Sequence, residues 1–221
     1  MAERAARGRR VVLVFARAPV PGRVKTRLVP ALGAAGAARV HRALVRRTLA
    51  VAARIPGARL ELWCDGGPPH PFLRREAARV GARVRVQRGP DLGARMDHAL
   101  RQALRRRPRP AAVLVGTDCP MLDASHLEAA FRALERGGDG VLGPAADGGY
   151  VLVGLRRPCG ALFRGIPWGT GEVLATTRRA AAAVGVRLRE LPPRADLDRP
   201  EDWAALSPDL RRRLLGGILS A

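Results

Sequence analysis

Short apolar runs alternate with longer stretches of helical periodicity along almost the whole chain, and this alternation restricts the fold more than any other feature. Seven runs have the length and composition of strands: Val11–Ala16, Arg59–Cys64, Arg83–Gln87, Ala112–Gly116, Gly140–Gly143, Tyr150–Gly154 and Val186–Glu190. Helical stretches lie between them near Gly33–Arg54, Pro71–Val80, Gly93–Arg106, Ser125–Glu135 and Gly171–Val184. This order is typical of βαβ units with a parallel sheet covered by helices. We therefore predict a three-layer α/β/α protein.

Two parts of the chain depart from this alternation. In residues 137–154, two short strand signals flank Asp147, Gly148 and Gly149, which predicts a hairpin turn and hence a mixed sheet. Residues 200–219 read as one or two helices broken at Ser207-Pro208. No linker divides the 221 residues, so we predict one domain over 1–221, with a basic N-terminal extension at 1–9.

The charge is the outlier of the composition. Lys plus Arg number 40 against 19 Asp plus Glu, which gives a net charge of +21 and suggests a polyanionic partner. The only lysine is Lys25, so the excess is arginine, and this skew also fits the codon bias of a GC-rich genome. Aromatic residues are 4% of the chain, and no stripe of aromatic and basic residues is present for base stacking. We predict no specific nucleic-acid partner.

Other residue types exclude several classes. The cysteines Cys64, Cys119 and Cys159 are far apart, which argues against a disulfide framework and favours a cytoplasmic location. The histidines lack H-E-x-x-H spacing, so zinc-protease chemistry is excluded. No apolar run has the length of a membrane span, so we predict none.

The loop after the first strand contains Pro21, Gly22, Arg23, Lys25 and Arg27. A turn with basic residues at this point is where open α/β sheets bind phosphates, although neither a dinucleotide fingerprint nor a Walker A loop is present. A lone lysine among arginines suggests a compact contact to phosphate. A solvated basic turn is the alternative interpretation.

Carboxylates follow other strands. Asp118 comes directly after the fourth strand, where a divalent cation such as Mg²⁺ or Mn²⁺ could take an oxygen ligand, whereas Asp123 has the position of a helix N-cap. Asp91 either contacts a nucleotide or caps the following helix. Asp198 with Glu201 also fits a capping box, and it can serve a site as well.

Gly148, Gly149 and Tyr150, the only tyrosine, could line a substrate pocket, because glycines allow close approach of the backbone. A tight turn that needs positive φ would explain the two glycines equally well.

Six segments in order, FARAPVPGRVKTRL, DLGARM, GTDCPML, LGPAADGGYVLVGL, IPWGT and DLDRPEDW, resemble the DUF2064 family, also called the transferase 1 or arsenosugar-biosynthesis glycosyltransferase-like family. The resemblance spans about Val11–Trp203. It implies the GT-A fold of nucleotide-diphospho-sugar transferases, with a mostly parallel mixed sheet. A more distant similarity is to cofactor guanylyltransferases and molybdopterin-cofactor nucleotidyltransferases.

The resemblance also implies roles for particular residues. Gly22, Arg23 and Lys25 would lie on the loop around the nucleotide phosphates, Asp118 would be the metal-binding and catalytic aspartate, and Asp198 a second metal ligand. With them we assign Pro21, Arg27, Asp91 and Gly93 to the nucleotide, Asp147 to catalysis, and Gly148, Gly149, Tyr150, Trp168 and Thr170 to the acceptor pocket. Arg199 stands where the superfamily usually has threonine.

The function that follows is a metal-dependent transferase with an activated nucleotide as substrate. A glycosyltransferase acting on a nucleotide sugar and a small-molecule acceptor is favoured, because the first loop lacks the Gly-rich L-A-G-G-x-S-x-R-M pattern of the superfamily's nucleotidyltransferases. The alternatives are a nucleotidyltransferase that transfers a nucleotide from an NTP to a phosphorylated small molecule and, from charge alone, a nucleic-acid-binding protein.

Overall fold

The computed structural model describes residues 9–105 and 110–216, and in this part the strands form one mixed sheet. The strands are β1 Arg10–Ala16, β2 Ala58–Cys64, β3 Arg83–Val86, β4 Ala111–Val115, β5 Gly140–Pro144, β6 Tyr150–Leu155 and β7 Leu188–Glu190. Their order across the sheet is β3-β2-β1-β4-β6-β5-β7. Only β6 runs antiparallel to its neighbours, so the predicted hairpin and mixed sheet are confirmed.

The helices follow the predicted positions within a few residues. They are α2 Val29–Ala53, α3 Pro71–Arg79, α4 Leu92–Leu104, α5 Ala124–Glu135, α6 Val173–Ala183, α7 Pro200–Ala205 and α8 Pro208–Gly216, with 3-10 turns η1 at Thr26–Leu28 and η2 at Gly160–Phe163. The break between α7 and α8 occurs at the predicted Ser207. The helix α2 begins four residues earlier than predicted and bends at Gly33, whose φ of 67° interrupts the helical backbone. Residues 1–8 of the predicted extension, Arg106 and residues 217–219 lie outside the described residues.

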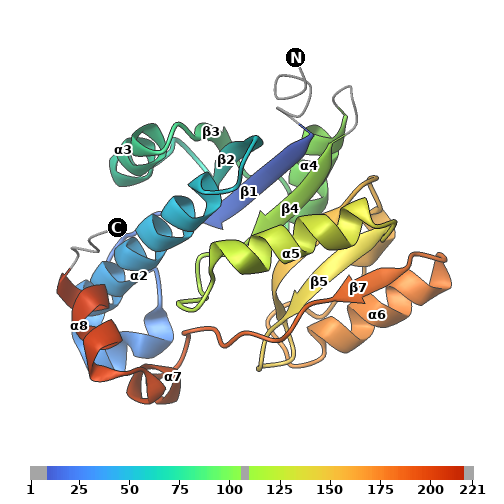
Figure 1. Ribbon diagram of the computed structural model, residues 1–221. Helices are drawn as coiled ribbons and strands as arrows, with labels where there is room; N and C mark the ends of the chain where they lie inside the picture. Colours follow the sequence, from blue (N-terminus) through green and yellow to red (C-terminus); the bar gives the residue numbers. More distant parts are fainter. Residues whose placement is uncertain (1–8, 106–109, 217–221) are drawn as a thin grey trace.

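Two helical layers cover the sheet (Figure 1). On one face, α2, α3 and α5 pack over the central strands, because residues such as Leu127, Phe131 and Leu134 of α5 recur at helical spacing and are fully buried. On the other face, α4, η2 and α6 bury a second cluster that includes Met96, Leu100 and Leu162. The three-layer prediction is therefore confirmed.

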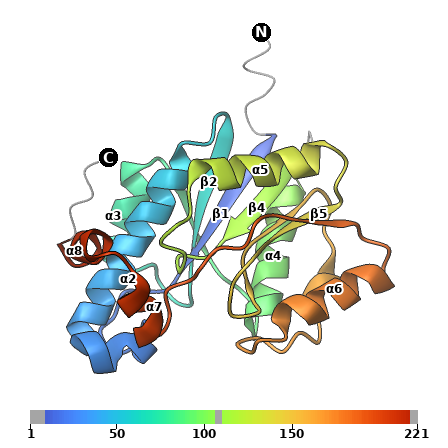
Figure 2. The ribbon, with the colours of Figure 1, turned by 60° about the horizontal axis from the view of Figure 1, so that its bottom comes forward.

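The last two helices pack at the end of α2. Trp203 of α7 and Leu214 of α8 share a third buried cluster with Val40 and Leu44 of α2. This packing fixes the segment before α7, which crosses the molecule from β7 (Figure 2).

Several strand ends meet at one edge of the sheet. The parallel strands β1, β2 and β4 all end at this edge, and β6 begins there, since Leu152 pairs with Val115 at the end of β4. Loops from distant parts of the sequence therefore meet at one place. No helix in residues 9–105 and 110–216 is long and apolar enough to cross a membrane.

Candidate functional site

A cleft of about 560 Å³ lies at the edge where β1, β2 and β4 end and β6 begins. Of the residues assigned to a site from the sequence, nine line this cleft: Lys25, Arg27, Asp118, Asp147, Gly149, Tyr150, Trp168, Thr170 and Asp198. Its volume is within the range of about 300–1,000 Å³ that is usual for small-molecule sites.

Lys25 is the centre of the basic side of the cleft. Its side chain is 3% exposed, and Nζ lies 2.6 Å from Oδ1 of Asp118 and 3.8 Å from Oδ1 of Asp198. Nζ also donates to the carbonyl oxygen of Leu197. Within the described residues, Lys25 is the only non-glycine with positive φ, at 48°. The interpretation of Lys25 as part of a solvated basic turn is therefore wrong.

The two aspartates that meet Lys25 come from opposite ends of the chain. Asp118 follows β4 and is 53% exposed, whereas Asp198 precedes α7 and is 36% exposed. Nη1 of Arg27 donates to Oδ2 of Asp198 at 2.5 Å. Each carboxylate therefore has a basic partner and also faces solvent in the cleft.

Asp198 does not cap the following helix. The carboxylate of Asp202 accepts the backbone N–H groups of Asp198 and Arg199 at 2.9 and 2.7 Å, and Arg199 is the N-cap of α7. The predicted capping box of Asp198 and Glu201 is therefore wrong, because the helix begins one residue later. Asp198 is left available to the cleft.

Residues 191–198 form an extended strap along the edge of the sheet. The backbone N–H of Leu191 donates to the carbonyl of Leu142 at 2.9 Å, that of Arg194 to Pro144 at 3.0 Å, and that of Leu197 to Asp118 at 2.8 Å. In this extended backbone the buried Leu197 separates Asp196 from Asp198, so both carboxylates reach the cleft.

The opposite wall of the cleft comes from the β5–β6 turn and the residues before α6. Oδ1 of Asp147 accepts the backbone N–H of Gly149 at 2.9 Å. The rings of Tyr150 and Trp168 meet edge to face with centroids 6.1 Å apart. Thr170 donates its hydroxyl to the carbonyl of Pro167 at 2.9 Å, which holds its loop in a turn. Burial raises the pKa of the Tyr150 phenol, so this side chain is neutral in the folded protein.

Gly148 does not line the cleft, and its role is steric. Its φ is 85°, and a Cβ at this position would lie 2.1 Å from the carbonyl oxygen of Gly171. The turn interpretation therefore accounts for Gly148, since no other residue could adopt this backbone and this contact.

Among the cleft residues that the sequence analysis did not assign, two have a shifted pKa, Asp196 and His41. Burial, with the nearby charge of Asp147, raises the pKa of Asp196 from 3.8 to about 6. His41 of α2 is 3% exposed, and its Nε2 lies 3.0 Å from the carbonyl oxygen of Arg17, so Nε2 carries the proton of this bond. Asp196 stands two residues from Asp198 in an extended segment, and this spacing was the available signal. Only the fold brings His41 to the cleft.

Other assigned residues do not reach the cleft. Pro21, Gly22 and Arg23 are exposed on the loop before Lys25. Asp91 caps α4 by accepting the N–H of Ala94 at 2.7 Å. Gly93 is buried, and a Cβ there would lie 2.7 Å from Nε1 of Trp168, so this glycine lets α4 approach the acceptor wall. Asp123 caps α5, as predicted, through the N–H of His126.

The donor set at the cleft suits a hard divalent cation. Mg²⁺ prefers oxygen ligands and is often held by one or two carboxylates together with substrate phosphates. Asp118 and Asp198 supply two such carboxylates, both beside Nζ of Lys25, although no group of three or more His, Cys, Asp or Glu side chains in the described residues forms a metal cluster. The residues therefore fit a cation that shares its coordination with a substrate.

Comparison with known proteins places this geometry in a family. The profile of DUF2064, described as an uncharacterized protein conserved in bacteria, matches residues 48–170. A crystal structure from Desulfovibrio desulfuricans G20, described as a candidate nucleotide-diphospho-sugar transferase, is 32% identical, with a TM-score of 0.78 over 86% of this chain and 83% of that one. No protein with a curated description matches the chain.

More distant structures share the fold. The inositol-1-phosphate CTP transferase of T. maritima is 12% identical, with a TM-score of 0.56 over 96% of this chain and 98% of that one. Glucosyl-3-phosphoglycerate synthase of Mycobacterium tuberculosis, in complex with Mg²⁺ and UDP, is 13% identical, with a TM-score of 0.52 over 100% of this chain and 83% of that one. These likenesses confirm the GT-A-like fold. The similarity at 32% identity to the structure described as a candidate nucleotide-diphospho-sugar transferase supports the expectation of a transferase. With a matching profile over more than half of its length, the chain belongs to the DUF2064 family.

Proposed function

We propose that this protein is a metal-dependent transferase that moves a sugar from a nucleotide sugar to a small acceptor. The observation that carries the proposal is the convergence of Lys25, Asp118 and Asp198 at one mouth of the cleft, from segments at least 80 residues apart in the sequence. A buried lysine between two carboxylates contributes little to the stability of the fold, because the desolvation of the paired charges offsets much of their attraction. We infer that the lysine has a functional role. That role is the recognition of a nucleotide together with its cation.

The positive charge of the cleft suits a diphosphate. Arg17, Arg27 and Arg95 line the cleft in addition to Lys25. Guanidinium groups present forked N–H donors that match phosphate oxygens, and an ammonium adds a compact point charge. These residues hold the diphosphate of the donor and stabilise the negative charge that develops on it when the sugar departs.

Asp118 and Asp198 are the residues that would hold Mg²⁺ or Mn²⁺. When bound, the ion neutralises charge on the diphosphate and makes it a better leaving group. Asp118 leaves the end of β4, a strand buried on both faces, so its backbone position is fixed by the core of the sheet. The strap fixes Asp198 through the bond between the N–H of Leu197 and the carbonyl of Asp118.

The opposite wall is assigned to the acceptor. Tyr150 and Trp168 offer apolar ring surface for a small molecule, and Asp147 is a carboxylate beside them. In the transfer, the bond between the anomeric carbon and the phosphate oxygen breaks and a bond to the acceptor oxygen forms. Asp147 accepts the proton of the acceptor hydroxyl as general base, and the nucleoside diphosphate leaves.

Nucleotidyl transfer from an NTP is the second candidate, because cytidylyltransferases are among the structures with this fold. It predicts a different product, pyrophosphate. The first loop favours glycosyl transfer, since it contains Pro19, Pro21 and a single glycine, Gly22, in place of several glycines that could wrap a triphosphate. The free thiols of Cys64, Cys119 and Cys159 fit a reducing compartment, and we place the reaction in the cytoplasm.

The test begins with a thermal-shift screen of nucleoside diphosphates, nucleotide sugars and NTPs, each with and without Mg²⁺ or Mn²⁺. A ligand that binds the folded state raises the melting temperature by mass action. We expect a nucleotide sugar and its nucleoside diphosphate to give the largest shift, and only with the cation. The selected nucleotide is then incubated with the protein, and released nucleoside diphosphate and pyrophosphate are measured by phosphorus NMR.

Asp118→Asn is the test variant, and Asp209→Asn is the matched control, because Asp209 pairs with Arg213 in α8, away from the cleft. Asp118→Asn should lose the cation-dependent shift, and Asp209→Asn should keep it. Release of pyrophosphate would select nucleotidyl transfer. A shift that is equal in both variants, or that does not depend on the cation, would contradict the proposed metal site.

A further inference from the structure

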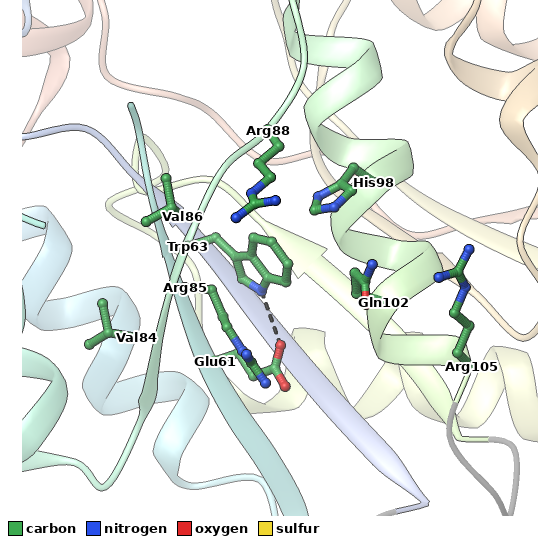
Figure 3. Close-up of a pocket in the computed structure, with 9 residues that line it drawn as sticks. All are labelled: Glu61, Trp63, Val84, Arg85, Val86, Arg88, His98, Gln102 and Arg105. Carbon is green, nitrogen blue, oxygen red and sulfur yellow. Dashed lines mark hydrogen bonds between the residues drawn. The ribbon is translucent and has the colours of Figure 1, made fainter. Parts of the chain in front are cut away.

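A second cavity, of about 570 Å³, lies between the edge strand β3 and helix α4. It is lined by Glu61, Trp63, Val84, Arg85, Val86, Arg88, His98, Gln102 and Arg105. We call it the β3–α4 groove. Figure 3 shows Arg85 and Arg88 on its strand side and His98, Gln102 and Arg105 along α4, with Trp63 between the two rows. None of these residues lines the catalytic cleft.

The arrangement of the sheet explains why the groove exists. The face of the sheet that carries Trp63 is covered by α4 over β1 and β4, whereas the helices α2 and α3, which connect β1 to β2 and β2 to β3, pack on the other face. The outer part of β2 and all of β3 therefore have no helix over this face. His98, Gln102 and Arg105 are spaced at i, i+4 and i+7, so they form one stripe of α4 that faces the gap.

The cations of the groove lack acidic partners. Among the described residues, Arg85, Arg88 and Arg105 take part in no ion pair, although Arg101, one turn earlier on α4, pairs with Asp97 at 2.8 Å. The only carboxylate lining the groove is Glu61, which is 3% exposed and already accepts from Arg59 at 3.0 Å and from the indole N–H of Trp63 at 3.1 Å. The positive charge is therefore not compensated by the protein.

The uncompensated positive charge of the groove also affects the pKa of His98. Burial and the nearby Arg88 and Arg105 lower its pKa, against a smaller opposite effect of Asp97. Both arginines thus act on one imidazole inside the groove, and Nδ1 of His98 is buried without a hydrogen-bond partner in the structure.

We propose that the β3–α4 groove is a second binding site, for a small molecule that carries two or more linked phosphates. Three guanidinium groups provide forked donors for several phosphate oxygens, and the cavity is larger than a single phosphate needs. Trp63 is 3% exposed, so its ring forms the floor and offers no free face for a base. The groove therefore recognises the phosphate chain, which a free oligophosphate and a nucleotide share. The site does not depend on the proposed transferase reaction.

The experiment uses inorganic tripolyphosphate as the probe, on the full chain without divalent cation. The triple variant Arg85→Gln, Arg88→Gln, Arg105→Gln is compared with the control Arg54→Gln, Arg132→Gln, Arg136→Gln. The control residues are exposed, have no ion pair in the described structure and do not line the groove, and both variants lose the same charge. Binding is followed by the NMR signals of the His98 ring, assigned with His98→Gln, and by calorimetry.

We expect saturable shifts of the His98 signals and a rise of its pKa when tripolyphosphate binds, because an anion beside the imidazole favours the protonated form. The groove variant should bind at least tenfold more weakly, and the control within about twofold of wild type. If the triple variant does not fold, Arg105→Gln alone should still weaken binding severalfold. ATP serves as a second arm, and affinity equal to that of tripolyphosphate shows that the phosphates alone are recognised.

Three results would overturn the site: unmoved His98 signals, equal losses in the groove and control variants, or equal affinity for orthophosphate. Equally tight binding of a glutamate hexapeptide would assign the groove to acidic peptides instead. The part of nucleoside diphosphate binding that depends on Mg²⁺, which is assigned to the cleft with Asp118, should be the same in the groove variant as in wild type. The experiment therefore distinguishes a failure of the proposed groove site from a failure of the proposed transferase function.

Discussion

Lys25 and Asp118 form an ion pair of 2.6 Å in which the ammonium is buried and the carboxylate is half exposed. The lysine is held from behind by the carbonyl of Leu197, so its position depends on the strap as well as on its own loop. An ammonium held in this way has a fixed position at the cleft, next to the place where the proposed diphosphate would bind.

Replacement of Lys25 should affect both stability and binding. Lys25→Ala leaves the carbonyl of Leu197 without its buried donor, and we expect a loss of about 1–3 kcal/mol in the free energy of unfolding, measured with urea. Affinity for a nucleoside diphosphate with Mg²⁺ should fall by about 1.5–3 kcal/mol in calorimetry. Lys25→Arg should also bind poorly, because the wider guanidinium does not fit between the two aspartates.

Arg39→Ala is the control for Lys25, since Arg39 is exposed on α2 and its loss removes the same charge. It should bind the nucleotide as wild type does. Equal affinities of wild type, Lys25→Ala and Lys25→Arg would remove Lys25 from the site.

Replacement by alanine should destabilise the protein to different extents at two glycines that have similar backbone conformations. Gly22 and Gly148 have φ of 77° and 85°, but a Cβ on Gly22 meets nothing within 4 Å, whereas one on Gly148 lies 2.1 Å from Gly171. Gly22→Ala should lower the free energy of unfolding by about 1–2 kcal/mol, because the only penalty is the left-handed backbone conformation of an L-residue. Gly148→Ala adds an overpacking cost of about 1–3 kcal/mol. Urea unfolding of both variants measures the difference, and equal costs would mean that the Gly148–Gly171 contact relaxes freely.

His41 should make stability depend on pH. Burial lowers its pKa below the ordinary 6.5, so the unfolded chain takes up a proton in a range where the folded protein resists it. The stability from this group is therefore present above pH 6.5 and is lost as the pH falls below that value. In His41→Gln, the decrease in the free energy of unfolding between pH 7.5 and 5 should be smaller than in wild type. Parallel pH curves for the two proteins would contradict this interpretation.

The excess of arginine should give only non-specific binding of DNA. Arginines occur on nearly every helix, so they can neutralise phosphates without reading bases. Fluorescence anisotropy with random duplexes should show binding that decreases steeply with salt concentration and does not depend on sequence. Sequence-selective binding at physiological salt would instead support the nucleic-acid-binding alternative.

The helices and strands could be predicted from the sequence, because each has its own periodic pattern of apolar residues. The stripe on α5 and the apolar run of β4 are local patterns, and both were placed within two residues. The capping box of α7 was predicted one residue too early, because Glu201 and Asp202 are adjacent acids, and only the backbone geometry selects Asp202 as the residue that bonds the N-terminal N–H groups.

The site was less accessible, because its contacts join distant segments. Asp118 could be predicted from its place after a strand. The strap could not, since its bonds to Leu142 and Pro144 use backbone atoms that leave no pattern in the sequence. The burial of Lys25 follows from the strap, and the one hint was that this position alone has lysine in place of arginine.

The strap also sets when the cleft becomes complete during synthesis. The ribosome makes the chain from its N-terminus, so Lys25 and Asp118 emerge long before residues 191–198. Until Leu197 and Asp198 arrive, the ammonium lacks its carbonyl acceptor and one of its two carboxylates. A nascent chain that already contains the whole sheet except β7 therefore lacks part of the proposed nucleotide site. The proposed nucleotide site is therefore assembled only after residues 191–198 have been made, although most of the residues that line the cleft are synthesised much earlier.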